Sequence, residues 1–211
     1  DLGGISYFSP ITQSGSVESI IVKAYDDDGY IFESEEIQII IGQTELIINE
    51  TFEGQNNWIV GDSQDNATAG IWELAAPNGT YDEQSNLVQP DIDHTFDGTN
   101  CFLTQNSNNP NSPGQSDVDG GKTTLISPNY DLSNYSGAIF SYWKWFTNNQ
   151  GNNPGNDIWL VQTSNDGGDS WVDLENTIDS NNYWRLEQFY LNDFISLSSE
   201  VKFKFIAEDT Y

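Results

Sequence analysis

The stretch that decides the fold is residues 201–206, which reads VKFKFI. Apolar and basic residues alternate there, and a period of two places one set on a buried face of a β-strand and the other on a wet face. Residues 184–189 (WRLEQF) show a similar but less regular pattern. Clusters of Asn, Gly, Asp and Pro separate these from further strand candidates, and no helical pattern stands out. The chain is therefore predicted to be an all-β sandwich or jelly roll. The other strand candidates are residues 46–48, 70–74, 101–105, 123–127, 138–146, 157–163 and 171–175.

The first 43 residues carry a separate pattern. Residues 20–24 (IIVKA) and 37–41 (IQIII) are rich in β-branched residues and flank an acidic turn at 25–29 (YDDDG). This predicts a β-hairpin with a longer loop. Nothing before Ile20 supplies the other strands of an immunoglobulin-type sandwich. We interpret residues 1–43 as the C-terminal hairpin of an immunoglobulin-like domain, and residues 44–211 as a second domain.

The charge balance excludes two classes of partner. The 211 residues include 33 acidic and 6 basic side chains, giving a net charge of −27. So few Lys and Arg cannot build a patch for nucleic acid or for an anionic membrane. An aromatic content of 13% distinguishes the chain from acidic disordered sequences, which are poor in aromatics. No apolar run is long enough to span a membrane. Because residue 1 is not Met and no signal peptide stands there, we expect an excised piece of a longer protein.

The sequence contains no motif that indicates catalysis. His94 is the only histidine and Cys101 the only cysteine. A zinc site needs about three or four N or S ligands, which these two residues cannot supply. A single cysteine also excludes an internal disulfide. Choosing a glycosidase pair among 33 acids has no basis in spacing. We therefore expect no enzymatic activity.

Oxygen-rich loops indicate calcium instead. Calcium takes about six to eight oxygen ligands from carboxylates, Asn side chains and carbonyls. Four segments offer such groups, and none of them fits an EF-hand loop. The alternative for each segment is an ordinary solvated turn, because Asp-Gly and Asn are common turn residues. The segments are residues 62–66 (DSQDN), 91–93 (DID), 97–98 (DG) and 117–120 (DVDG).

Residues 164–171 (SNDGGDSW) match the pattern Ser-x-Asp-x-Gly-x-Ser/Thr-Trp. The match looks like the Asp-box of sialidase-type propellers, where it recurs on successive blades. Here it occurs once. We interpret Ser164, Asp166, Gly168 and Trp171 as a structural hairpin turn, in which the carboxylate accepts hydrogen bonds from loop amides.

Aromatic residues raise the alternative of sugar binding. In residues 141–146 (SYWKWF), Trp143 and Trp145 share one strand face, and Tyr142, Lys144 and Phe146 share the other. One of these faces must belong to the core. If the Lys144 face is wet, Tyr142 and Phe146 are the exposed aromatics. If the other face is wet, Trp143 and Trp145 form a platform on which pyranose rings can stack.

Several strings, taken in order, resemble the MAM domain, an extracellular jelly-roll module. They resemble still more closely the MAM-like module appended to secreted bacterial zinc carboxypeptidases and related exoproteins. The resemblance covers about residues 50–211. It rests on Phe52-Glu53, Trp58, Ile71-Trp72 and residues 89–95 (QPDIDHT), 124–128 (TLISP), 140–145 (FSYWKW) and 201–205 (VKFKF). Residues 65–72, 117–125 and 161–168 match strings of the bacterial modules.

The resemblance implies a two-sheet antiparallel jelly roll without catalytic residues. It implies a cation, expected to be calcium, between the first strand and the loop carrying Asp-His-Thr. This makes Glu53 and Asp93 ligand candidates. The bacterial strings add Asp62, Asp65, Asn66 and Asp119.

Two features depart from the family. Cys101 has no partner for the disulfides of animal MAM domains, and the chain stops before the family's last strand. A missing strand would leave an unpaired edge inside the sheet. We expect the hairpin at residues 20–41, or a neighbouring molecule, to cover that edge.

Together these observations predict a non-catalytic, calcium-stabilised accessory module of a secreted or cell-surface bacterial protein, in which the catalytic neighbour is a metallopeptidase. It would serve as a spacer or as an adhesion or substrate-targeting domain. Its partners would be the adjacent domains and an extracellular glycan or protein. The alternative is a carbohydrate-binding module that uses exposed aromatics. The acidic surface fits an exported, marine setting.

Overall fold

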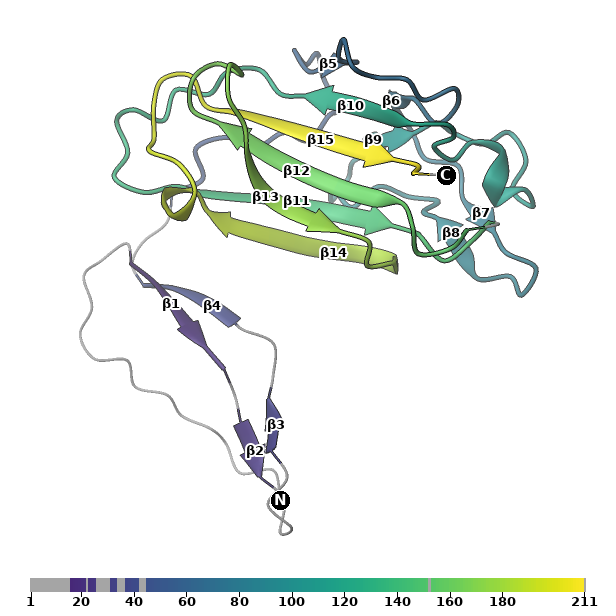
Figure 1. Cartoon of the computed structure of the whole chain (residues 1–211), viewed down its shortest axis with the longest axis horizontal. Coiled ribbons are helices and arrows are strands. Elements are labelled where there is room, and N and C mark those ends of the chain that lie inside the picture. Colours follow the sequence, from purple (N-terminus) through teal and green to yellow (C-terminus); the bar gives the residue numbers. More distant parts are fainter. Residues whose placement is uncertain are drawn as a thin grey trace. The chain divides into compact units, whose positions relative to one another are not determined.

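The computed structural model (Figure 1) describes residues 16–21, 23–25, 31–33, 37–41, 45–151 and 153–210. The chain divides into two compact units, residues 1–49 and 50–211. Each unit is described by itself.

The first unit contains a two-part antiparallel hairpin. β1 (Ser16–Ile20) pairs with β4 (Ile37–Ile41), and β2 (Lys23–Tyr25) pairs with β3 (Ile31–Glu33). The strand expected over residues 20–24 is thus divided between β1 and β2, while the return strand lies where the β-branched run predicts it. The acidic turn falls largely outside the described residues. The origin of this unit in an immunoglobulin-like domain stays a prediction.

The second unit is built from short antiparallel strands and two single-turn 3₁₀ helices. Its described residues contain no α-helix, so the all-β prediction is confirmed. The elements are β5 (Ile59–Val60), β6 (Trp72–Ala75), β7 (Thr80–Tyr81), β8 (Leu87–Gln89), β9 (Cys101–Thr104), η1 (Pro113–Gln115), β10 (Lys122–Ile126), β11 (Ile139–Phe146), β12 (Ile158–Ser164), β13 (Val172–Thr177), β14 (Asn181–Tyr190), η2 (Leu191–Asp193) and β15 (Lys202–Glu208).

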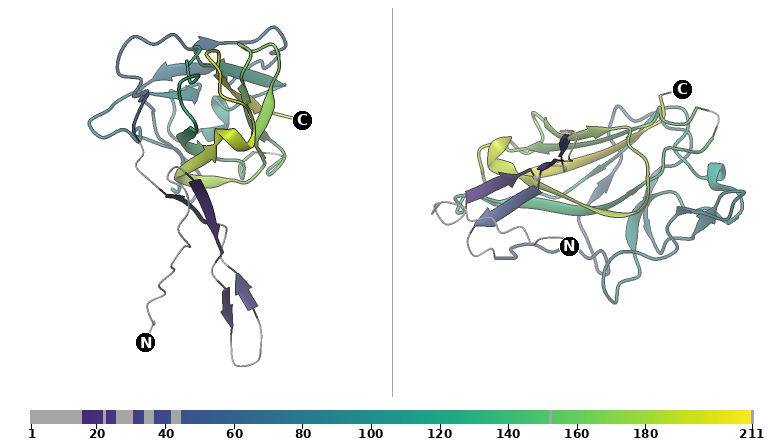
Figure 2. Two further views of the ribbon diagram at one scale, coloured as in Figure 1. Left: turned by 90° about the vertical axis from the view of Figure 1, so that its left-hand side faces the viewer. Right: turned by 90° about the horizontal axis from the view of Figure 1, so that it is seen from below.

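One five-stranded sheet dominates this unit, in the order β13-β12-β15-β10-β5. The pairs β11–β14, β6–β9 and β7–β8 form smaller antiparallel sheets. Figure 1 shows β15 in yellow between β12 and β10, with β11 and β14 running beside the large sheet. The left view of Figure 2 looks nearly along the strands and shows the sheets on opposite sides of a shared interior.

That interior is aromatic. Phe203, Phe205 and Ala207 of β15 are buried, whereas Lys202 and Lys204 are only partly covered; Ile206, on the same side of the strand as the lysines, is buried too. The alternation at residues 202–205 therefore identifies the core face, as the period of two predicts, whereas at Ile206 and Ala207 both sides of the strand are buried. The core extends from the large sheet to the smaller ones through partly buried aromatics on β9, β11 and β14. These are Phe102, Phe140, Tyr142, Phe146 and Phe189.

Most predicted strands lie within a few residues of observed ones, with two kinds of error. Residues 46–48 form no strand, because an apolar β-branched run becomes a strand only where a partner is available. β5, β7 and β8, which are two or three residues long, correspond to no predicted strand.

The last strand, β15, is paired on both sides. In the part of the chain that the structure describes, β11 pairs with β14 alone, so the other edge of β11 carries no strand. Coverage of such an edge by the hairpin depends on how the two units are placed against one another, and it stays a prediction.

Candidate functional site

The two faces of β11 differ, and a buried lysine identifies the inner one. Lys144 is 2% exposed, and its flanking residues Tyr142 and Phe146 pack against the core. The ammonium group forms ion pairs with Glu175 on β13 and with Glu187 on β14. The Tyr142 hydroxyl donates a hydrogen bond to Glu175. Of the two arrangements that the sequence left open, the structure adopts the one in which the tryptophans face outward.

Burial also changes the acid–base character of this inner face. The pKa of Tyr142 lies well above its ordinary value, chiefly because burial disfavours the phenolate and secondly because the Glu175 carboxylate repels it. Tyr142 therefore stays a neutral hydrogen-bond donor, and neither it nor Phe146 offers an exposed ring for stacking.

The outer side of β11 and β14 presents aromatic rings to solvent. Trp143 is 44% exposed, and its cross-strand partner Leu186 is 40% exposed. The His94 ring stacks on Trp143 with ring centres 3.5 Å apart and planes 17° from parallel. Trp184 meets His94 and Trp145 edge-on at 6.1 and 6.0 Å. We call His94, Trp143, Trp145, Trp184 and Leu186 the aromatic face.

Hydrogen bonds fix the aromatic face to β8 and to the loop after it, which supplies His94. The indole nitrogen of Trp145 donates to the carbonyl of Val88 at 2.7 Å. The indole nitrogen of Trp184 donates to the carbonyl of Ile92 at 3.3 Å. The rings are therefore held before any ligand arrives, which reduces the ordering cost of binding. The same loop adds exposed apolar surface at Ile92 and Phe96.

The two principal calcium candidates converge on this loop. Asp93 is buried, and its Oδ2 accepts a hydrogen bond from the Thr95 amide at 3.0 Å. Glu53 reaches the same loop from residues before β5, where its Oε1 accepts the amides of Thr99 and Asn100 at 2.7 Å each and its Oε2 accepts the Asn100 side-chain amide at 3.1 Å. Burial raises the pKa of the Cys101 thiol to about 12, and the charges of Asp93 and then Glu53 add to the rise. Asp93 and Glu53 therefore both bind backbone amides of residues 95–100.

The surroundings of Asp93 and Glu53 are tight and, within the described part of the chain, lack a basic partner. A Cβ added to Gly98 would stand 2.4 Å from Asp93 Oδ2, so the loop wraps the carboxylate too closely for any side chain. No Lys or Arg of the described residues forms an ion pair with Asp93 or Glu53. Within those residues, no three His, Cys, Asp or Glu side chains group to hold a metal. The remaining ligands would therefore have to be loop carbonyl and amide oxygens, which calcium accepts.

Hydrogen bonds that pin the chain near β5 to β10 occupy three of the weaker calcium candidates. Asp65 accepts the amide and hydroxyl of Thr124 at 2.9 and 2.6 Å, and Asn66 accepts the Lys122 amide at 3.1 Å. The Asp62 carboxylate accepts the Gln64 amide at 2.9 Å and lies 3.8 Å from the Lys204 ammonium. These contacts give the three residues a structural role at the edge of the large sheet.

Asp119, the remaining candidate, lies among other aspartates at one end of the large sheet. Burial raises the pKa of Asp157 to about 6, with additions from the charges of Asp209, Asp117 and Asp119. The pKa of Asp117 is also raised, first by burial and then by Asp119. The Gly120 amide donates to Asp209 at 2.8 Å. We call Asp117, Asp119, Asp157 and Asp209 the acidic end.

The Asp-box residues lie in the turn between β12 and β13. Ser164 Oγ donates to Asp166 at 2.7 Å and accepts the Gly168 amide at 2.9 Å. Asp166 accepts the amide and the hydroxyl of Ser170. These bonds, those from Ser170 first, hold the pKa of Asp166 well below its usual range. The Lys204 ammonium lies 4.1 Å from the centre of the Trp171 ring. The motif closes a turn, and its residues are not among those that line the pocket at the start of β14.

Sequence reasoning missed several residues that complete these sites. In the sequence analysis His94 was the sole histidine and part of the string at residues 89–95, Trp184 and Asp157 were parts of strand candidates, and Asp209 was given no role. The acidic end could have been found from the register of β15 with its two neighbours. Lys122 at the start of β10 and Ile158 at the start of β12 both lie opposite Glu208 at the end of β15. Acids that precede β10 and β12 must therefore meet those that follow β15.

Among the described residues, no helix has the length and apolar character that a membrane span requires. No protein-family model matches this chain, and neither a curated protein nor a solved structure matches it.

Proposed function

We propose that this chain is a non-catalytic accessory module of a secreted or cell-surface bacterial protein, and that it holds its parent protein against an extracellular ligand. The observation that carries the proposal is the aromatic face, with the His94–Trp143 stack at its centre. Adhesion or substrate targeting accounts for this face better than a passive spacer does, because a spacer needs no exposed, immobilised aromatic rings.

The exposure of Trp143 sets how much binding free energy its substitution can remove. A Trp side chain buries up to about 250 Å², so 44% exposure leaves roughly 100 Å² for a partner to cover. At about 25 cal/mol per Å², that area sets a ceiling of about 2–3 kcal/mol. Trp143→Ala is therefore expected to weaken binding by at most about 100-fold.

A carbohydrate is the ligand that the aromatic face favours. Rings fixed in place can stack on the apolar faces of pyranoses, and the net charge of −27 disfavours anionic macromolecules. The test is co-sedimentation of the full chain with insoluble polysaccharides, comparing wild type with Trp143→Ala and Trp184→Ala. Val172→Ala is the matched control, because Val172 is equally exposed at 41% but lies on the large sheet. Equal binding by all variants would overturn a role for the aromatic face.

We further propose that calcium stabilises the loop that carries this face. Support comes from the hydrogen bonds of Asp93 and Glu53 to amides of the same loop and from the close approach of Gly98 to Asp93. Bound there, the ion would neutralise two carboxylates and hold residues 93–100 in place. Calcium should raise the melting temperature of the wild type, and Asp93→Asn should abolish most of that rise. Asp179→Asn, which changes an exposed acid in another loop, should keep the rise. An unchanged melting temperature on chelation would contradict calcium binding.

The MAM-like resemblance, the neighbouring metallopeptidase and the bacterial, marine setting belong to the same proposal. They rest on the strings quoted from the sequence. Calcium ligation by Asp62, Asp65, Asn66 and Asp119 likewise stays a prediction.

A further inference from the structure

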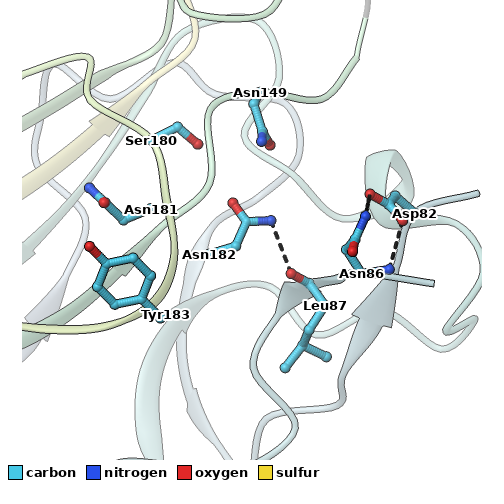
Figure 3. Close-up of a pocket in the computed structure, with 8 residues that line it drawn as sticks. All are labelled: Asp82, Asn86, Leu87, Asn149, Ser180, Asn181, Asn182 and Tyr183. Carbon is cyan, nitrogen blue, oxygen red and sulfur yellow. Dashed lines mark hydrogen bonds between the residues drawn. The ribbon is translucent and has the colours of Figure 1, made fainter. Parts of the chain in front are cut away.

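A polar pocket of about 530 Å³ lies at the start of β14, outside every group of residues singled out from the sequence. Three segments far apart in the chain line it: the β7–β8 connection with the first residue of β8, the loop after β11, and residues 180–183. Figure 3 shows Asp82 and Asn86 on one side, Ser180, Asn181 and Tyr183 on the other, and Asn182 between them. The lining residues are Asp82, Asn86, Leu87, Asn149, Ser180, Asn181, Asn182 and Tyr183.

Hydrogen bonds build the walls of this pocket. Asn182 Nδ2 donates to the carbonyl of Leu87 at 3.0 Å, which ties β14 to β8. Asn86 Nδ2 donates to Asp82 Oδ2 at 2.9 Å, which closes the β7–β8 turn. The Asn148 amide donates to Ser180 Oγ at 2.8 Å. The pocket is therefore formed in the free protein.

Several polar groups on these walls have no partner in the described part of the chain. No hydrogen bond engages the Asn181 amide or the Tyr183 hydroxyl there, and the side-chain oxygens of Asn86 and Asn182 accept none. Tyr183 is 56% exposed, so its ring also offers an apolar surface at the rim. The pocket thus presents both donors and acceptors, beside one aromatic ring.

The lining narrows the chemistry of the ligand. It contains no Lys, Arg or His, so nothing there compensates a phosphate or a carboxylate. Its one acid, Asp82, is tied down by Asn86, whose hydrogen bonds lower the pKa of that carboxyl. Leu87 is its only aliphatic residue, too little apolar surface for a lipid chain. Amides, hydroxyls and one aromatic ring are the groups that recognise a neutral polyhydroxylated molecule.

We propose that this pocket binds a neutral sugar residue of an extracellular glycan. Its volume lies within the roughly 300–1,000 Å³ typical of small-molecule sites. Asn182 of the pocket and Trp184 of the aromatic face lie two residues apart on β14, and both donate hydrogen bonds to carbonyls of residues 87–92, so the pocket and that face adjoin along β14. One sugar unit occupies the pocket while its neighbours stack on the aromatic face. The inference rests on the proposal that the chain binds a carbohydrate. It adds a second sugar-binding site and a preference for neutral over anionic sugars.

The test is calorimetric titration of the full chain with neutral oligosaccharides of glucose, xylose, mannose and N-acetylglucosamine, and with an oligogalacturonate as the anionic comparison. Each lost neutral hydrogen bond should weaken binding about two- to tenfold. We expect Asn181→Ala combined with Tyr183→Ala to weaken binding of one neutral oligosaccharide at least tenfold. Asn176→Ala, an exposed asparagine on β13, should leave it unchanged.

The outcomes separate the pocket from the aromatic face. If the double variant binds like wild type while Trp143→Ala does not, the pocket proposal is overturned and glycan binding by the aromatic face stands. If no oligosaccharide binds wild type, both the pocket proposal and glycan binding by the aromatic face are overturned. Tighter binding of the oligogalacturonate would overturn the neutral-sugar class. Melting temperatures near that of wild type establish that the variants are folded.

Discussion

Lys144→Met is expected to destabilise the protein strongly, because it removes the cation from a buried cluster of charges. Lys144 is 2% exposed, and its ammonium contacts Glu175 and Glu187, whose side chains are 12% and 16% exposed. Methionine has a similar length and fills the space. What changes is that two largely buried carboxylates lose their counter-ion while Tyr142 still bonds one of them.

The magnitude follows from the cost of an unpaired buried charge. Removing one partner of a buried ion pair costs about 3–5 kcal/mol. For a domain of this size each kcal/mol lowers the melting temperature by about 2–4 °C, so the melting temperature should fall by about 6–20 °C. Arg185 lies 2.6 Å from Glu187, which leaves Glu175 as the carboxylate that suffers most.

The assay is urea unfolding at pH 7 followed by tryptophan fluorescence. Lys122→Met, a partly exposed lysine on β10, is the matched control and should change stability by less than about 0.5 kcal/mol. Adding Glu175→Gln to Lys144→Met should recover part of the loss, since the amide needs no counter-ion. A loss below 1 kcal/mol for Lys144→Met, or no recovery in the double variant, would refute the reasoning.

Two further predictions concern carboxylates with shifted pKa values. The pKa of Asp157 is raised to about 6, so the folded state binds a proton more tightly than the unfolded state does, and stability is lost as pH rises through 6. Asp157→Asn should therefore stabilise the metal-free protein at pH 8, and the gain should vanish near pH 4; a destabilised variant at pH 8 would contradict this. The pKa of Asp166 is lowered, so its contribution is present at neutral pH and lost in acid. Asp166→Ala should lower the melting temperature at pH 7 and by much less near pH 2, and equal losses at both pH values would argue against the turn hydrogen bonds as the cause.

The sequence alone predicts a strand and its core face where the pattern lies within the strand itself. The alternation at residues 202–205 identifies β15 and its core face, because the side-chain period of a strand is a property of the strand alone. Strands of two or three residues, such as β5 and β7, are too short to show a period.

The sequence could not decide which face of β11 is buried. Hydration alone would place Lys144 on the wet face. Its burial depends on Glu175, 31 residues away, and on Glu187, 43 residues away, and neither can be assigned to it without the strand order. The same holds for the acidic end, where the pairing of β15 with both β10 and β12 brings Asp117, Asp157 and Asp209 together.

The central claim is that the aromatic face is the ligand-contacting surface. Two-dimensional NMR of the seven tryptophan indole N–H groups tests it most directly, with each resonance assigned by single Trp→Phe substitution. On addition of a saturating neutral oligosaccharide, the resonances of Trp143 and Trp184 should shift while those of the buried Trp72 and Trp159 stay in place. If a bound oligosaccharide left Trp143 and Trp184 unchanged, the aromatic face would not be the binding surface and the account would be wrong.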